Sequence, residues 1–238
     1  MKIEGRNGVY EAIKSGLTIE KILASNNSKD PAFNRVISIA KDKKIKIQFV
    51  SNEILNRESE TKKHQGVIAI ASDFQYSSID EILENKKGEY NFIAILDNIA
   101  DPHNFGSIIR VCECMGVDGI IISKNRACPV NETVVRTSAG AINHMKIAKV
   151  TNINSTIEDL KENGIWVYGC ELGGEPLSTA DFKGNIAIII GSEGDGISKS
   201  TINHCDKVYT IEMNGKVNSL NASVASGIIF YEAFKQRI

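Results

Sequence analysis

An apolar run that ends in glycines constrains the fold of this chain more than any other feature. Ile186-Ala-Ile-Ile-Ile190 has no polar residue, which is typical of a strand buried on both faces. It runs directly into Gly191-Ser-Glu-Gly-Asp-Gly196, where glycines allow a ligand to approach the main chain closely. We therefore predict a central strand that opens at its carboxyl end into a binding loop.

Similar apolar runs alternate with helical patterns along residues 89–238. We expect strands at Phe92–Leu96, Gly119–Ser123, Lys146–Val150, Ile165–Tyr168, Ile186–Ile190 and Lys207–Ile211. We expect helices at Gly106–Met115, Asn131–Ala141, Ser155–Asn163 and Ala222–Gln236. Apolar strands that alternate with helices predict an α/β domain with a parallel sheet covered on both faces.

A smaller α/β unit precedes this domain. Its expected strands are Ile19–Ala24, Ile45–Val50 and His64–Ala71, and its expected helices are Asn7–Lys14, Pro31–Asp42 and Asn52–Leu55. Residues 73–88 are polar enough for a linker that carries a short helix. We therefore predict a front domain at 1–72, a linker at 73–88 and the larger domain at 89–238.

The charge is distributed unevenly between these parts. Residues 1–72 carry 13 Lys or Arg against 8 Asp or Glu, whereas residues 89–238 carry 13 against 17. The net charge of the whole chain, -1, indicates no partner. The basic front domain indicates an anionic partner for that domain, although ordinary variation of surface residues explains the same counts.

The cysteines favour a reducing compartment. There are five, and an odd number spread among apolar runs argues against a disulfide framework. Cys112-Glu-Cys114 is not followed by a second pair with zinc-ligand spacing, so we expect no metal. No apolar run approaches the roughly 20 residues that span a bilayer, and no secretory leader is visible. We expect a cytoplasmic protein.

Three polar loops follow expected strands, where ligands of open parallel sheets bind. They are residues 97–107, 191–198 and 213–223. Gly191, Gly194 and Gly196 do not match a dinucleotide fingerprint, and the lysine of a phosphate loop is absent. Glu193 and Asp195 disfavour a polyphosphate and suit a ligand with positive charge or hydroxyl donors.

Each polar residue in these loops also has a purely structural explanation. Asn104 and Asn221 are good helix N-caps, while Arg110 and Glu193 could be solvated surface charges. Small residues after Asn221 allow close approach to a ligand or to a partner subunit. The residues taken one at a time leave both interpretations open.

Taken together, the three loops resemble the motifs of SpoU or TrmH-type RNA ribose 2′-O-methyltransferases, members of the SPOUT class. The matching stretches are Asp101–Arg110, Ile189–Ile197, and Ile211–Met213 with Asn218–Ala225. His64-Gln-Gly66 and the region of Tyr10 resemble the longer RlmB-like members, which methylate a guanosine of 23S ribosomal RNA.

The resemblance implies a carboxyl-terminal deep trefoil knot on a parallel sheet, preceded by a small α/β domain like ribosomal protein L30e. It also implies a homodimer that binds RNA and uses S-adenosylmethionine. The catalytic residues implied are Asn104, Arg110, Glu193, Ser219 and Asn221. The implied cofactor-binding residues are Ile190, Gly191, Ile211, Met213 and Leu220.

The resemblance also assigns Arg110 to the reacting 2′-hydroxyl, as general base or as a positioning group. A free guanidinium accepts no proton, so we favour positioning and stabilisation of the developing alkoxide. Asn104 and Glu193 would orient Arg110 or the ribose, and Ser219 and Asn221 would complete the pocket. Lysines 41, 43, 44 and 46 would contact RNA phosphates; the alternative is an ordinary solvated surface. His64 could equally be a packed structural residue.

Three kinds of alternative remain: another substrate for the same enzyme class, a different enzyme class, and a protein without catalytic activity. A TrmH-like enzyme would act on transfer RNA, and another relative would methylate a ribosomal adenosine and so confer antibiotic resistance. A nucleotide-dependent oxidoreductase lacks its fingerprint after Phe92–Leu96. A catalytically silent RNA-binding protein would not need the full set of polar residues.

Overall fold

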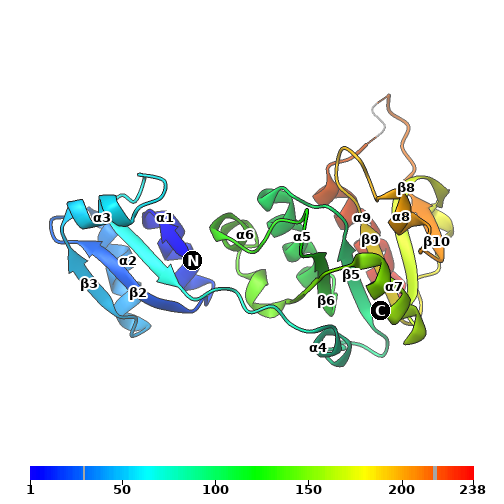
Figure 1. Cartoon of the computed structure of the whole chain (residues 1–238), viewed down its shortest axis with the longest axis horizontal. Coiled ribbons are helices and arrows are strands. Elements are labelled where there is room, and N and C mark those ends of the chain that lie inside the picture. The colour runs from blue at the N-terminus through cyan, green and yellow to red at the C-terminus, as the bar shows by residue number, and fades with distance from the viewer. Residues whose placement is uncertain (29, 217–218) are drawn as a thin grey trace. The chain divides into compact units, whose positions relative to one another are not determined.

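The computed structural model describes residues 1–28, 30–216 and 219–238, which form two compact units (Figure 1). Unit 1 comprises Met1–Gln75 and Val130–Asn143, and unit 2 comprises Tyr76–Pro129 and His144–Ile238. Each unit contains its own sheet. Within the described residues, none of the helices combines the length and hydropathy that a bilayer crossing requires.

Unit 1 is built on a four-stranded sheet in the order β1-β4-β2-β3. Its elements are β1 (Lys2–Glu4), α1 (Arg6–Lys14), β2 (Ile19–Ser25), α2 (Pro31–Asp42), β3 (Ile47–Val50), α3 (Asn52–Glu58), β4 (Val67–Ala71) and α6 (Glu132–Thr137). Helices α1 and α2 share a core with Ile22 and Ala24. Leu23, which points to the opposite face, packs instead with Leu55 of α3.

Unit 2 contains a six-stranded sheet in the order β10-β8-β9-β5-β6-β7, and every pair is parallel. The strands are β5 (Phe92–Leu96), β6 (Gly119–Ser123), β7 (Lys146–Val150), β8 (Trp166–Pro176), β9 (Ile186–Ile190) and β10 (Lys207–Thr210). The predicted parallel α/β sheet is therefore confirmed. All residues of β5 and β9 are buried, which explains their uninterrupted apolar sequences.

Helices cover both faces of this sheet (Figure 1). They are α4 (Ile79–Glu84), α5 (Pro102–Cys114), α7 (Ile153–Glu162), α8 (Lys199–Ile202) and α9 (Ala222–Lys235). Helices α4 and α7 share a core with Ile93 and Ile95 of β5. Phe92 points the other way and meets Phe230 of α9 edge-to-face, with ring centroids 5.9 Å apart. Helices α5 and α9 pack against each other.

The predicted start of the helix after β5 was wrong. We expected Gly106–Met115, but α5 begins at Pro102. Asp101 is its N-cap, and a proline in the first turn has a backbone angle suited to a helix start. Asn104 therefore lies inside the first turn, and its interpretation as the helix cap was also wrong.

Three other expectations from the sequence were incomplete or wrong. The strand expected at Ile165–Tyr168 extends to Pro176. Gly174 lies within this extension, where a Cβ would be 2.5 Å from the carbonyl oxygen of Val208. The helix at Asn131–Ala141 ends at Thr137 because Ala139 and Gly140 have positive φ. The short edge strand β1 was missed.

Gly119 is required for the packing of α4 on the sheet. A Cβ on Gly119 would lie 2.7 Å from two side-chain carbons of Ile82, a fully buried residue of α4. We predict that Gly119→Ala lowers the free energy of unfolding by about 1–3 kcal/mol, because a packed core must shift to admit the methyl group. Urea unfolding of the full chain measures this.

Gly88→Ala is the matched control, because no atom lies within 4 Å of a Cβ at that position. Its free energy of unfolding should change by less than about 0.5 kcal/mol. Equal unfolding curves for the two variants would contradict the packing explanation.

Candidate active site

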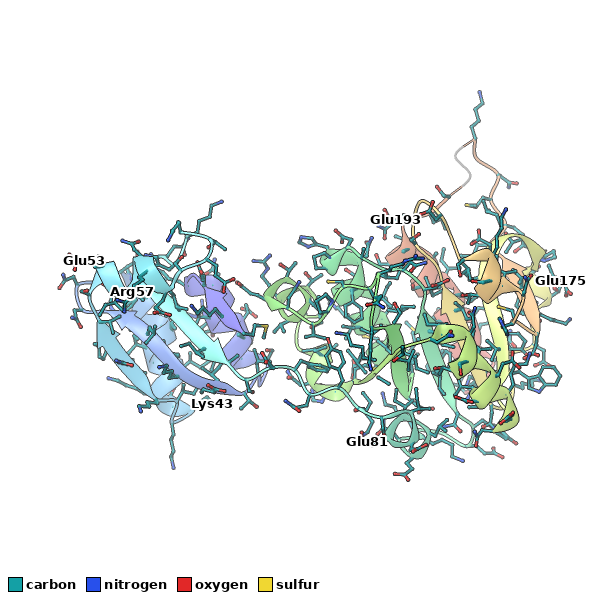
Figure 2. All side chains as sticks on the ribbon, viewed as in Figure 1. Lys43, Glu53, Arg57, Glu81, Glu175 and Glu193 are labelled. Atoms are coloured by element: carbon teal, nitrogen blue, oxygen red, sulfur yellow. The ribbon has the colours of Figure 1, made fainter. Side chains whose placement is uncertain are left out.

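The loop after β9 folds back on itself at the carboxyl edge of the unit 2 sheet. Ser192 and Gly196 exchange two main-chain hydrogen bonds, at 3.1 and 3.0 Å. Gly191 lies so close to this return that a Cβ there would be 2.1 Å from the carbonyl carbon of Gly196. We call residues 191–197 the glycine turn. Glu193 lies at its tip and is exposed (Figure 2).

The loop after β5 fixes the position of Asn104. Asp101 Oδ1 accepts a hydrogen bond from the Asn104 amide at 2.8 Å and so caps α5. The buried Asp97, the first residue after β5, accepts from the Ser198 amide at 2.9 Å. The loops after β5 and β9 are therefore joined directly.

Asn221 caps α9, and this fixes the orientation of its side-chain amide. Its Oδ1 accepts from the Ser223 and Val224 amides, at 3.0 and 3.3 Å, and from the Ser223 hydroxyl at 2.6 Å. With Oδ1 occupied in this way, Nδ2 must point to the other side, toward Asn104 and Glu193.

Asn104, Glu193 and Asn221 meet in one hydrogen-bonded group, which we call the amide–carboxylate cluster. Asn221 Nδ2 donates to Asn104 Oδ1 at 2.9 Å and also to Glu193 Oε1. Asn104 Nδ2 donates to the same Glu193 oxygen at 3.0 Å. Because Oε1 receives both amide donors, Glu193 Oε2 is left as the acceptor that a ligand can use.

A cavity of about 260 Å³ lies beside this cluster. Its lining includes all five residues predicted to bind the cofactor, together with Glu193 and Ser219: Ile190, Gly191, Glu193, Ile211, Met213, Ser219 and Leu220. The described lining contains three acidic residues, Glu171, Glu193 and Asp195, but no lysine, arginine or histidine. This charge suits a cationic ligand and disfavours a polyphosphate.

Arg110 does not join the cluster. It lies six residues after Asn104 on α5, about 9 Å along the axis and about 240° around it. Its side chain is exposed and forms no hydrogen bond or salt bridge with any residue that the structure describes. Asn218, part of the third motif, lies outside the described residues.

Four residues that hold these loops in place were not among the predicted site residues: Asp97, Asp101, Glu171 and Ser223. Asp97 directly follows an expected strand, and Asp101 directly precedes a proline. Both positions can be recognised in the sequence as the start of a loop or helix. Glu171 gave no signal, because the strand that carries it was expected to end at Tyr168. Its neighbour Cys170 also lines the cavity, and burial raises the pKa of the Cys170 thiol to about 12, so this thiol is protonated near neutral pH.

No group of three or more His, Cys, Asp or Glu side chains is arranged to hold a metal ion in the part of the chain that the structure describes.

Comparison with known proteins finds a matching family for each of the two parts of the chain. Residues 91–231 match the SpoU rRNA Methylase family, and residues 2–77 match the family described as RNA 2′-O ribose methyltransferase substrate binding. A Staphylococcus aureus (strain COL) protein assigned to the TrmH family of tRNA/rRNA methyltransferases is 40% identical over 99% of this chain and 96% of its own length. A Bacillus subtilis (strain 168) protein of the same description is 39% identical over 98% and 94%.

The fold also has solved counterparts. The SpoU methyltransferase AviRb from Streptomyces viridochromogenes, in complex with AdoMet, superimposes with a TM-score of 0.76. The two are 22% identical, and the match covers 100% of this chain and 90% of the other. This likeness supports the α/β fold described above.

We predict that Asn221→Ala loosens the glycine turn as well as the helix that Asn221 caps. Loss of an N-cap lowers the free energy of unfolding by about 1 kcal/mol. Loss of Asn221 Nδ2 also removes one of the two donors that hold Glu193 Oε1, so amides of residues 192–196 should exchange with solvent faster. Hydrogen exchange followed by NMR measures this.

Asn152→Ala is the matched control, since Asn152 caps α7 through two main-chain amides. The free energy of unfolding should fall by a similar amount in this variant, but the amides of the glycine turn should not exchange faster. Unchanged exchange in the Asn221 variant would contradict the prediction.

Proposed function

This chain belongs to the SpoU rRNA methylase family and is an RNA 2′-O-methyltransferase, and we propose that it methylates a guanosine ribose of 23S ribosomal RNA. The methyl donor is S-adenosylmethionine. The observation that carries the methyl-transfer part of this proposal is the meeting of Asn104, Glu193 and Asn221, from three separate loops, beside one acidic cavity. The choice of ribosomal RNA rests on the family that matches residues 91–231. A cytoplasmic location follows from a ribosomal RNA substrate and suits five free cysteines.

The cavity residues fit S-adenosylmethionine chemically. This cofactor carries a positive sulfonium and an amino group, and the described cavity lining contains acids and no basic side chain. The close approach of Gly191 to the returning chain presents main-chain groups to the cavity. We propose that Ile190, Gly191, Ile211, Met213 and Leu220 bind the cofactor, which supplies an electrophilic methyl group when bound.

We propose that the amide–carboxylate cluster orients the ribose. Glu193 Oε2 is placed to accept a hydrogen bond from a ribose hydroxyl or a base amino group. The second hydrogen of Asn104 Nδ2 can donate to a ribose oxygen, and the exposed Ser219 hydroxyl completes the polar wall. Fixed donors and acceptors of this kind hold the reacting oxygen in line with the methyl group.

Arg110 has a different role in this proposal. Because no described side chain pairs with it, its guanidinium is available for the RNA. A guanidinium presents up to five donors and accepts none, so Arg110 positions the 2′-hydroxyl and stabilises the alkoxide that develops there. The proton then leaves to another acceptor, for which Glu193 Oε2 is the candidate in the amide–carboxylate cluster.

Unit 1 supports RNA as the substrate. Residues 2–77 match a substrate-binding family, and the four lysines at 41, 43, 44 and 46 are exposed around the turn between α2 and β3, where Figure 2 labels Lys43. Such a cluster suits phosphate contacts. We propose that residues 1–72 are an L30e-like RNA-binding domain, joined by a linker at 73–88 to a methyltransferase domain at 89–238. Transfer RNA is the second candidate substrate, since the relatives' names include both RNAs.

We also propose a carboxyl-terminal trefoil knot and a homodimer. The tight return of the glycine turn, and the position of Ile211, Met213, Ser219 and Leu220 around the same cavity, are compatible with a threaded chain. On α9, Val224, Ile228 and Tyr231 are 50%, 39% and 55% exposed, and their spacing places them on one helix face. An apolar stripe of this kind beside α5 suits the same stripe of a second copy.

The substrate is tested with purified full-length protein, tritiated S-adenosylmethionine, and 23S ribosomal RNA or transfer RNA in separate reactions. We predict label in ribosomal RNA, at a guanosine identified by mapping. Arg110→Ala should lower transfer at least about 100-fold, because electrostatic positioning contributes this much in comparable sites, while cofactor binding stays unchanged. Arg110→Lys, which keeps the charge but loses the planar fork, should recover only part of the activity.

Label confined to transfer RNA would overturn the substrate, and label in neither RNA would favour a silent RNA-binding protein. Full turnover by Arg110→Ala would remove Arg110 from the mechanism.

The dimer is tested by Ile228→Asp, which places a charge in the apolar stripe. We predict a shift from dimer to monomer in sedimentation equilibrium, because an unpaired charge is costly in an apolar interface. Ile54→Asp on α3 is the matched control, as Ile54 is also a helical isoleucine, 36% exposed, and should leave the dimer intact. Wild-type protein that sediments as a monomer would contradict the proposal.

A further inference from the structure

We propose that Glu171 is a positioning residue for methyl transfer: its carboxylate holds the glycine turn in the conformation that presents Glu193 and shapes the cofactor cavity. This inference rests on the proposed function. Glu171 belongs to β8, outside the three sequence motifs, and lines the same cavity.

The Glu171 carboxylate is bound to the main chain on both oxygens. Oε2 accepts from the Ile197 amide at 2.6 Å, and Oε1 accepts from the Leu172 amide at 3.0 Å. Ile197 ends the glycine turn, and its amide has no other acceptor among the described residues. Hydrogen bonds from amides to a carboxylate are stronger than those between neutral groups, so this contact is well suited to fix a loop.

The carboxylate also occupies the space left by the missing side chain of Gly196. A Cβ on Gly196 would lie 2.0 Å from Glu171 Oε2, and the φ angle of Gly196 is +64°. Gly196 in turn exchanges two hydrogen bonds with Ser192, the residue before Glu193. The hydrogen bond from the Ile197 amide to Glu171 therefore also restrains Glu193, because Glu193 lies in the short turn that the Ser192–Gly196 hydrogen bonds close.

A second carboxylate holds the next amide from the opposite side. Asp97 accepts from Ser198, so two consecutive amides at the end of the glycine turn are held by acids. Asp97 follows β5 and Glu171 lies on β8, and these are the two strands that flank β9. Glu171 is the member of this pair that also faces the cavity, where its charge would favour a cationic donor.

The test compares Glu171→Gln with Glu175→Gln in the full-length protein. Glu175 lies on the same strand, is exposed, and sits at the outer edge of unit 2 away from Glu193 (Figure 2). We expect Glu171→Gln to weaken S-adenosylmethionine binding about tenfold by calorimetry, because a charge-assisted hydrogen bond is lost. Its kcat should fall and its KM for the cofactor rise, while the KM for RNA stays unchanged. Glu175→Gln should match wild type.

Hydrogen exchange gives a readout independent of activity. In the wild-type protein without cofactor, the Ile197 and Ser198 amides should be protected relative to Gly194, whose amide has no acceptor among the described residues. In Glu171→Gln, exchange should accelerate at Ile197 but not at Ile189 in β9, a contrast that general destabilisation would not produce.

Wild-type exchange at Ile197 as fast as at Gly194 would overturn the inference, even if the Gln variant did not fold. Wild-type cofactor affinity in Glu171→Gln would also overturn it. A wild-type protein that binds no S-adenosylmethionine would instead refute the proposed function, and the exchange measurement would still decide whether the Glu171 contact forms.

Discussion

The contact between Gly191 and the returning chain at Gly196 and Ile197 is the constraint on which the site depends. Any side chain at position 191 would overlap the main chain that faces it. Because the turn closes so tightly, the end of β9 and the start of α8 lie together, and Glu193 projects from the tip between them. The loops after β5 and β10 can then reach Glu193 from both sides with short side chains.

The acids around this turn act mainly as hydrogen-bond acceptors. Asp97, Asp101 and Glu171 each bind main-chain amides, and Glu193 binds the side-chain amides of two asparagines. A phosphate-binding loop uses the opposite arrangement, in which main-chain amides point at the ligand. Here protein carboxylates already occupy the Ile197 and Ser198 amides at the end of the turn, which disfavours an anion at that position.

Several parts of this fold could be predicted from sequence because their signals are local. Phe92–Leu96 and Ile186–Ile190 have the predicted bounds, since each is an apolar run with polar residues on both sides. The length of β8 was not predictable in this way, because Gly174 is explained only by the distant Val208. Glu171 was missed for the same reason: its partner, Ile197, is 26 residues away.

For the site, the parallel sheet explains why loops so distant in sequence meet. Strands β5, β9, β8 and β10 follow one another in the sheet and all point the same way, so the segments that leave their carboxyl ends lie at one edge of the sheet. The contact of Asn104 with Glu193 and Asn221 is expected from this rule together with the motif resemblance. The catalytic roles of these residues, and of Ser219, stay predictions.

The position of Arg110 relative to the amide–carboxylate cluster could not be predicted from the motif alone. Motif spacing places it in the same stretch as Asn104, but helix geometry turns it to another side of α5. The amide–carboxylate cluster is internally satisfied on the cofactor side, whereas Arg110 has no partner in the described chain. On the proposed mechanism, the site is preorganised for the cofactor and completed by the RNA, because Arg110, which is solvated in the free protein, would bind phosphate or ribose oxygens of the RNA. Such an arrangement would make catalysis depend on correct RNA docking, and it would give a separate substrate-binding domain a direct part in specificity.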